Sequence, residues 1–93
     1  MPKYVIEREI PNVGTLSSAD LKGIAVKSCG VLADMNRSGT NIKWEHSYVT
    51  GNKIYCVYDA PDENAVRQHA ERGGFPANKI EKVAVVINPA TAN

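Results

Sequence analysis

Hydrophobic and polar positions alternate along the first residues of the chain and then give way to a turn. Residues 3–10 carry Val5 and Ile6 among alternating neighbours, which is typical of a β-strand. The run ends at the cluster Pro11-Asn12-Val13-Gly14, whose residue types break regular structure. We therefore expect the first strand to cover residues 3–10.

A helical period follows this turn. Ser17, with Asp20 three residues later, has the spacing of a capping box, the pair of side chains that satisfies the first amides of a helix. Beyond it, apolar and small residues recur three and four positions apart: Leu21, Ile24, Ala25, Ser28, Val31, Leu32 and Met35. This pattern predicts one long amphipathic helix, after which the polar residues 36–41 turn the chain.

Two further strands are predicted at residues 42–50 and 53–59. Gly51-Asn52 between them suits a two-residue hairpin turn. Such a turn pairs Val49 with Ile54, Tyr48 with Tyr55, Ser47 with Cys56 and His46 with Val57. The small and aliphatic members of these pairs are expected to face the helices. The opposite face, which we expect the helices to leave bare, carries Trp44, His46, Tyr48, Tyr55 and Val57.

The rest of the chain completes the order βαββαβ. Pro61 and the acidic residues after it favour the start of a second helix, which Gly73-Gly74 ends. Residues 80–87 are rich in β-branched side chains and predict a fourth strand. The order indicates an α+β fold of the ferredoxin-like type, an antiparallel sheet in the order 4-1-3-2 with two helices on one face. We expect residues 1–93 to form a single domain with a flexible tail from about residue 89.

Composition restricts the function classes. The chain has 93 residues, with 11 basic and 10 acidic side chains and no basic run, so it offers nothing to hold a nucleic-acid backbone. It lacks a membrane-spanning run and a signal-peptide pattern, and we expect a cytoplasmic protein without a membrane partner. Cys29 and Cys56 form no CxxC pair and are expected to be reduced and buried. The aromatic bare face favours a homodimer.

Candidate chemistry gathers on that bare face. The apolar side chains of Tyr4 and Ile6 favour the helix side for these residues, which turns Glu7 and Glu9 towards His46. Carboxylates and an imidazole in this arrangement can bind a divalent transition metal or transfer a proton. The alternative is that all three are ordinary solvated strand residues.

Several segments resemble a small bacterial family of ferredoxin-like proteins whose shared domain is of unknown function and some of whose members are labelled nickel-binding. The segments are KYVIERE, WEHSYV, KIYCVY and VRQHAERGGFPAN, and the resemblance covers residues 3–89. It implies a ferredoxin-like dimer and a metal site.

The match to the nickel-labelled relatives is incomplete at the candidate ligands. Where those relatives have an aspartate and a histidine in the first strand and a histidine at the helix exit, this chain has Glu7, Glu9 and Phe75. His69 matches a histidine of the relatives, although a half-buried histidine bonded to a backbone carbonyl is the alternative. The candidate metal ligands are Glu7, Glu9, His46 and His69, with fewer imidazoles than nickel prefers.

The sequence favours a small ligand-binding protein, with nickel or another divalent transition metal as the candidate ligand and no organic cofactor. Two alternatives stay open. Dimeric ferredoxin-like proteins elsewhere include cofactor-free isomerases, cyclases and monooxygenases, so Trp44, Tyr48 and Tyr55 are candidate pocket residues for a hydrophobic substrate. The other alternative is a dimeric scaffold without chemistry. No motif identifies a reaction.

Overall fold

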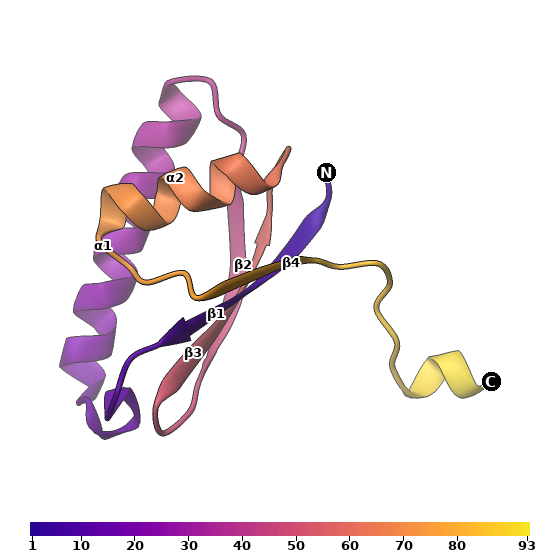
Figure 1. The fold of residues 1–93 in the computed structure, drawn as a ribbon, viewed down its shortest axis with the longest axis horizontal. Coiled ribbons are helices and arrows are strands. Elements are labelled where there is room, and N and C mark those ends of the chain that lie inside the picture. The colour runs from indigo at the N-terminus through magenta and orange to yellow at the C-terminus, as the bar shows by residue number, and fades with distance from the viewer.

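The computed structural model describes residues 1–93 and arranges the helices and the sheet in two layers (Figure 1). The elements are β1 (Lys3–Glu9), α1 (Ser18–Arg37), β2 (Lys43–Val49), β3 (Lys53–Asp59), α2 (Glu63–Gly73) and β4 (Lys79–Lys82), with short 3-10 helices at Val13–Thr15 and Pro89–Ala92. The strands form one antiparallel sheet in the order β2-β3-β1-β4, and both helices cover one face of it. The predicted ferredoxin-like α+β fold is confirmed.

The helix ends follow the local signals in the sequence. The Ser17 hydroxyl accepts a hydrogen bond from the Asp20 amide at 3.1 Å, and the Asp20 carboxylate accepts one from the Ser17 amide at 3.4 Å. This capping box satisfies two amides that the first turn of α1 leaves free. At the start of α2 the Asp62 carboxylate accepts a hydrogen bond from the Ala65 amide at 2.9 Å, and Gly74 ends α2 with a φ of 69°, a left-handed conformation that glycine adopts at little cost.

Strand β1 has the orientation that the sequence favoured. Tyr4, Ile6 and Arg8 are buried on the helix side, whereas Glu7 and Glu9 lie on the other face. The core between the layers contains twelve buried residues, and Ile6, Met35, Val13 and Val66 are its most completely buried hydrophobic side chains.

The hairpin of β2 and β3 has the predicted register over four residue pairs and then departs from it. Glu45 is unpaired, and the register shifts so that Trp44 faces Tyr58. This β-bulge inverts the alternation of side chains along β2. Trp44 therefore lies on the helix side, and its predicted place on the open face is wrong. Glu45 instead forms an ion pair with Lys3.

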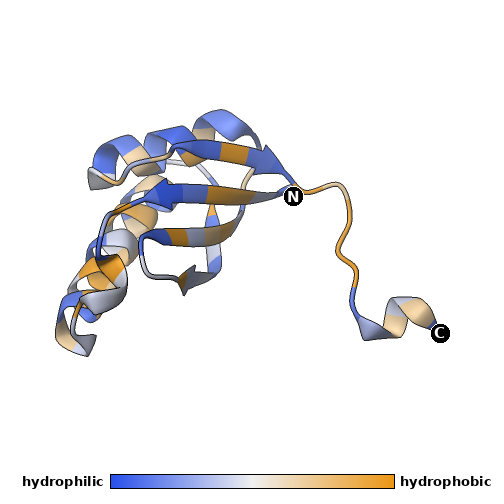
Figure 2. Cartoon of the chain, turned by 60° about the horizontal axis from the view of Figure 1, so that its bottom comes forward, coloured by the Kyte–Doolittle hydropathy of each residue, from blue (hydrophilic) through white to orange (hydrophobic).

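The fourth strand is shorter than predicted. Residues 79–82 pair with β1, and the Val83 amide donates the last hydrogen bond, to the Lys3 carbonyl at 2.8 Å. Strand β1 begins at Lys3, directly after Pro2, whose ring restricts its backbone, so a longer β4 has no strand to pair with. Residues 84–87 leave the sheet, and Figure 2 shows this segment as strongly hydrophobic. Val85 and Ile87 are each 73% exposed.

The cysteines are both free, but only Cys56 is buried. Cys29 is exposed because it follows Ser28 on α1, and the buried side of that helix consists of Ser28, Leu32 and Met35. The expectation of a buried Cys29 is therefore wrong. Neither helix combines the length and hydrophobicity that a membrane crossing needs.

Candidate functional site

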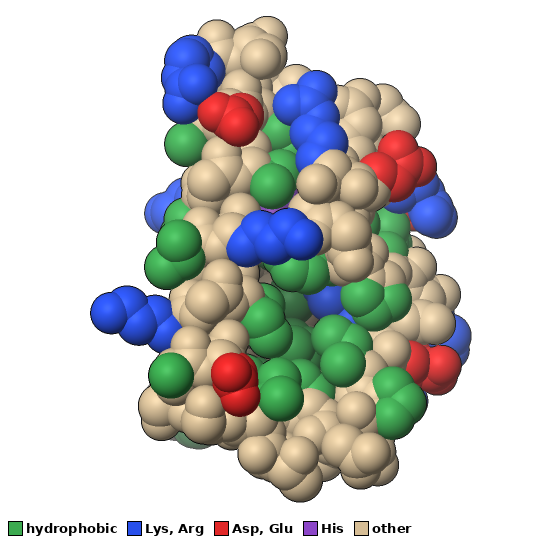
Figure 3. Space-filling model, turned by 90° about the vertical axis from the view of Figure 1, so that its left-hand side faces the viewer, with side chains coloured by type: hydrophobic (Ala, Val, Ile, Leu, Met, Phe, Trp, Pro, Cys, Tyr) green, Lys and Arg blue, Asp and Glu red, His purple; other side chains and the backbone are tan.

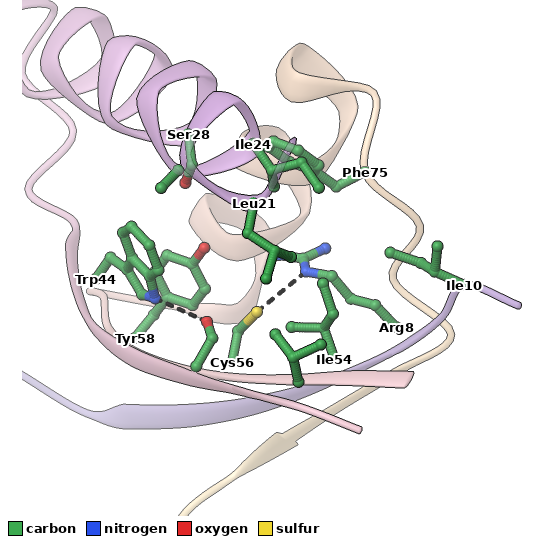
Figure 4. A pocket seen from close by; sticks show the side chains of 13 residues that line it. Arg8, Ile10, Leu21, Ile24, Ser28, Trp44, Ile54, Cys56, Tyr58 and Phe75 are labelled. Atoms are coloured by element: carbon green, nitrogen blue, oxygen red, sulfur yellow. Dashed lines mark hydrogen bonds between the residues drawn. The ribbon is translucent and has the colours of Figure 1, made fainter. Parts of the chain in front are cut away.

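A cavity of about 210 Å³ lies between the sheet and the first half of α1. Figure 3 shows its opening as a hollow among hydrophobic side chains, with Lys or Arg atoms visible at its base. Hydrophobic residues make up ten of the thirteen that line it, and the main ones are Leu21, Ile24, Trp44, Val49, Ile54 and Phe75. They come from α1, β2, β3 and the loop that follows α2 (Figure 4).

The cavity exists because the apolar side of α1 packs over only part of its length. Its buried residues are Ser28, Leu32 and Met35, whereas Leu21 and Ile24 in the first turns are half-buried and line the cavity. Their apolar surface is available to a ligand.

Arg8 is the cation of the cavity, and it is only 2% exposed. Its Nε donates a hydrogen bond to the Cys56 sulfur at 3.4 Å, and its Nη1 donates one to the Pro76 carbonyl at 2.6 Å. The guanidinium lies 5.5 Å from the centre of the Phe75 ring, close enough for a cation–π contact. Its Nη2 is buried without a hydrogen-bond partner. None of the ion pairs of the molecule involves Arg8.

His69 lies behind the cavity wall and is completely buried. Its Nε2 is 3.0 Å from the hydroxyl of Ser28, and its ring packs against Tyr58 and Phe75. His69 is therefore more deeply buried than the half-buried histidine considered as the alternative, and the side-chain partner of its Nε2 is a hydroxyl. Burial, and then the charge of Arg8, lower the pKa of His69 to about 4, so the imidazole is neutral at neutral pH.

The Ser28–His69 pair resembles the serine and histidine of a hydrolytic triad, but the carboxylate that completes such a triad is missing. Nδ1 of His69 is buried without a partner, so no carboxylate orients the ring. A base with so low a pKa is also weak at neutral pH. Burial raises the pKa of the neighbouring Tyr58 phenol, which stays protonated and therefore uncharged. The pair therefore lacks the oriented and basic histidine that activates a serine hydroxyl.

The four candidate metal ligands do not meet in one place. Glu7 accepts a hydrogen bond from Lys53 at 3.2 Å, an interaction that raises the pKa of Lys53, and Glu9 lies beside Asn78. His46 is exposed at the far side of β3 from Glu7, and its ring contacts Tyr48. The buried His69 lies on the other side of the sheet. No three His, Cys, Asp or Glu side chains are grouped closely enough to hold a metal, so the donors of one chain do not fit nickel.

The three candidate pocket aromatics are likewise separated. Trp44 lines the cavity, where its indole donates a hydrogen bond to the Ser47 hydroxyl at 2.9 Å. Tyr48 and Tyr55 form a cross-strand pair on the open face and do not line the cavity. The bulge at Glu45 causes this separation.

Sequence reasoning missed the polar residues of the cavity. Arg8 is a charged residue at a core-facing position of β1, and Ser28 is a polar residue within the apolar side of α1. Each was visible as an exception to its hydrophobic pattern. Such exceptions are the signal that would have pointed to the cavity.

Comparison with known proteins places the chain in a family. A family model described as Nickel responsive protein SCO4226-like matches residues 4–83. The chain belongs to this family. The predicted resemblance to a small bacterial ferredoxin-like family is thereby confirmed.

A solved structure supports the same fold. The crystal structure of SCO4226 from Streptomyces coelicolor A3(2) superposes on this chain with a TM-score of 0.74 and 20% sequence identity, over 91% of this chain and 99% of that one. At this low sequence identity the similarity establishes only that the two proteins share a fold. No curated protein matches the sequence.

Proposed function

We propose that the protein binds a small, largely apolar molecule in the cavity between α1 and the sheet. The observation that carries this proposal is the cavity itself, a largely hydrophobic space whose polar lining residues are Arg8, Ser28 and Ser47. Ligand sites commonly have this composition, and those for drug-sized molecules measure about 300–1,000 Å³. An apolar cavity of about 150 Å³ accommodates benzene. A volume of about 210 Å³ therefore suits a substituted aromatic ring or a short aliphatic chain.

The natural reporter of binding is Trp44, the single tryptophan of the chain, because it lines the cavity. We expect toluene to change the fluorescence of Trp44 in a saturable way. The variant Ala25→Leu places a larger side chain in the cavity and should abolish the change. Ala33→Leu is the matched control, because Ala33 is exposed on the same helix away from the cavity. No saturable change in the wild type, or equal loss in both variants, would contradict the proposal.

Nickel is the second candidate ligand, because the chain belongs to a family described as nickel responsive. One chain does not bring three suitable donors together, so such a site would need donors from a second copy. His46 is the imidazole that remains exposed to solvent.

A homodimer is part of the same proposal. The open sheet face carries Tyr48, which is 62% exposed, and residues 84–87 extend a hydrophobic segment beyond the sheet. Exposed apolar surface of this kind is typical of an interaction site. A second copy that covers the open sheet face and residues 84–87 would bring further metal-binding side chains close to His46.

A further inference from the structure

The cavity has a positive and hydrogen-bond-donating end. Arg8 is the one charged residue among the thirteen that line it, and no acidic side chain takes part in the lining. The ammonium group of Lys27 lies 5.7 Å from the centre of the Phe75 ring, which also contacts Arg8. Two cations therefore flank one aromatic residue of the cavity wall. In Figure 4 the guanidinium of Arg8 lies between Cys56 and Phe75.

The charge of Arg8 has no compensation within the chain. Its neighbours are the Cys56 sulfur, the Pro76 carbonyl, the Phe75 ring and the Tyr58 phenol, and none of them is a carboxylate. Moving an unpaired cation out of water is costly, and an anion with good hydrogen-bond geometry recovers part of that cost. The nearby His69 and Tyr58 are uncharged at neutral pH, so neither supplies the missing charge.

Arg8 also has unused hydrogen-bond donors. A guanidinium carries five N–H groups, and Nη2 accounts for two of them. Nη2 is buried and makes no hydrogen bond, although Nε and Nη1 are both engaged. The engaged atoms fix the position of the group, whereas the N–H groups of Nη2 have no acceptor. Arginine recognises carboxylates in this way, through charge and directed N–H groups together.

We propose that the ligand of this cavity is a small organic carboxylate with an aromatic or short aliphatic body, and that its carboxylate binds Nη2 of Arg8. This inference rests on the proposed function, because it specifies what the cavity binds. The apolar body would contact Leu21, Ile24 and Trp44, which lie on the helix and strand walls of the cavity. The head group would face the only cation in the lining.

The test compares three probes of similar size: benzoate, the neutral amide benzamide, and toluene. Each is titrated into the wild-type protein and followed by Trp44 fluorescence and calorimetry. We expect benzoate to bind at least about tenfold more tightly than either neutral probe. Equal affinities for all three would overturn the inference and leave the proposed function standing. Binding of none would overturn both.

A variant assigns the preference to one residue. Arg8→Met replaces the buried cation by an apolar side chain of similar length, a change that folded proteins often tolerate. It should remove the preference for benzoate, a loss of about tenfold or more, while toluene binds as before. Arg37→Met removes an exposed cation at the far end of α1 and is the matched control. A preference that persists in Arg8→Met would overturn the role of Arg8. If this variant does not fold, the wild-type comparison of the three probes decides alone.

Discussion

The stability of the protein should fall between about pH 6.5 and pH 4 because of one buried histidine. His69 is completely buried, and its pKa is about 4 in the folded chain, against an ordinary value of 6.5. Between these values the unfolded chain binds more protons than the folded one, so stability decreases as the pH falls. The contribution is fully present above the ordinary pKa and is lost as the pH falls through the folded pKa.

The size of this effect follows from the difference between the two pKa values. Each pKa unit corresponds to about 1.4 kcal/mol, so the shift of His69 predicts a loss of about 3 kcal/mol across this pH range. That is a large fraction of the stability of a small domain, about 5–15 kcal/mol. Denaturant unfolding at a series of pH values measures it directly.

A double variant isolates the contribution of His69 from that of the other titratable groups. His69→Phe with Ser28→Ala removes the imidazole without leaving the Ser28 hydroxyl unpaired. Its stability should depend less on pH than that of the wild type, by about 3 kcal/mol over the same range. His46→Ala is the control, because His46 is exposed, and it should keep the wild-type dependence. If the double variant and the wild type have parallel pH profiles, burial of His69 does not lower its pKa.

Three further predictions concern the surface. Cys29 should react quickly with a thiol reagent in the native protein and Cys56 only after unfolding, because only Cys29 is exposed; equal rates would contradict this. Light scattering should give about twice the chain mass of 10.1 kDa, and a chain truncated after residue 83 should dissociate more readily; a wild-type monomer would refute the dimer. If nickel binds, His46→Ala should weaken the binding by about tenfold or more in calorimetry, and an unchanged affinity would place the site elsewhere.

The fold was predictable because independent local signals agreed. The capping box at Ser17, the turn at Gly51-Asn52 and the glycine pair at the end of α2 each define the end of an element, and the structure has an element end at each place. Consistency between local signals and the overall pattern is what allows a sequence to specify a single fold.

Two features depend on how neighbouring strands pair, and the sequence analysis did not predict them. The bulge at Glu45 has no signal in the alternation of β2, because an inserted residue is defined only by the strand beside it. The length of β4 depends on where β1 begins, and the apolar composition of residues 84–87 carries no information about that. The position of Cys29 was predictable in principle, because it lies one residue away from the buried positions of α1.

The two faces of the sheet differ in the ligands that they can accept. The cavity on the helix side carries the uncompensated charge of Arg8, which repels a divalent cation from the imidazole of His69 and the thiol of Cys56. The open face carries Glu9 and His46, whose side chains are exposed and of the types that bind borderline metals. A metal therefore has no favourable position in the cavity. If nickel and an organic carboxylate both bind this protein, they bind on opposite sides of the sheet and need not compete.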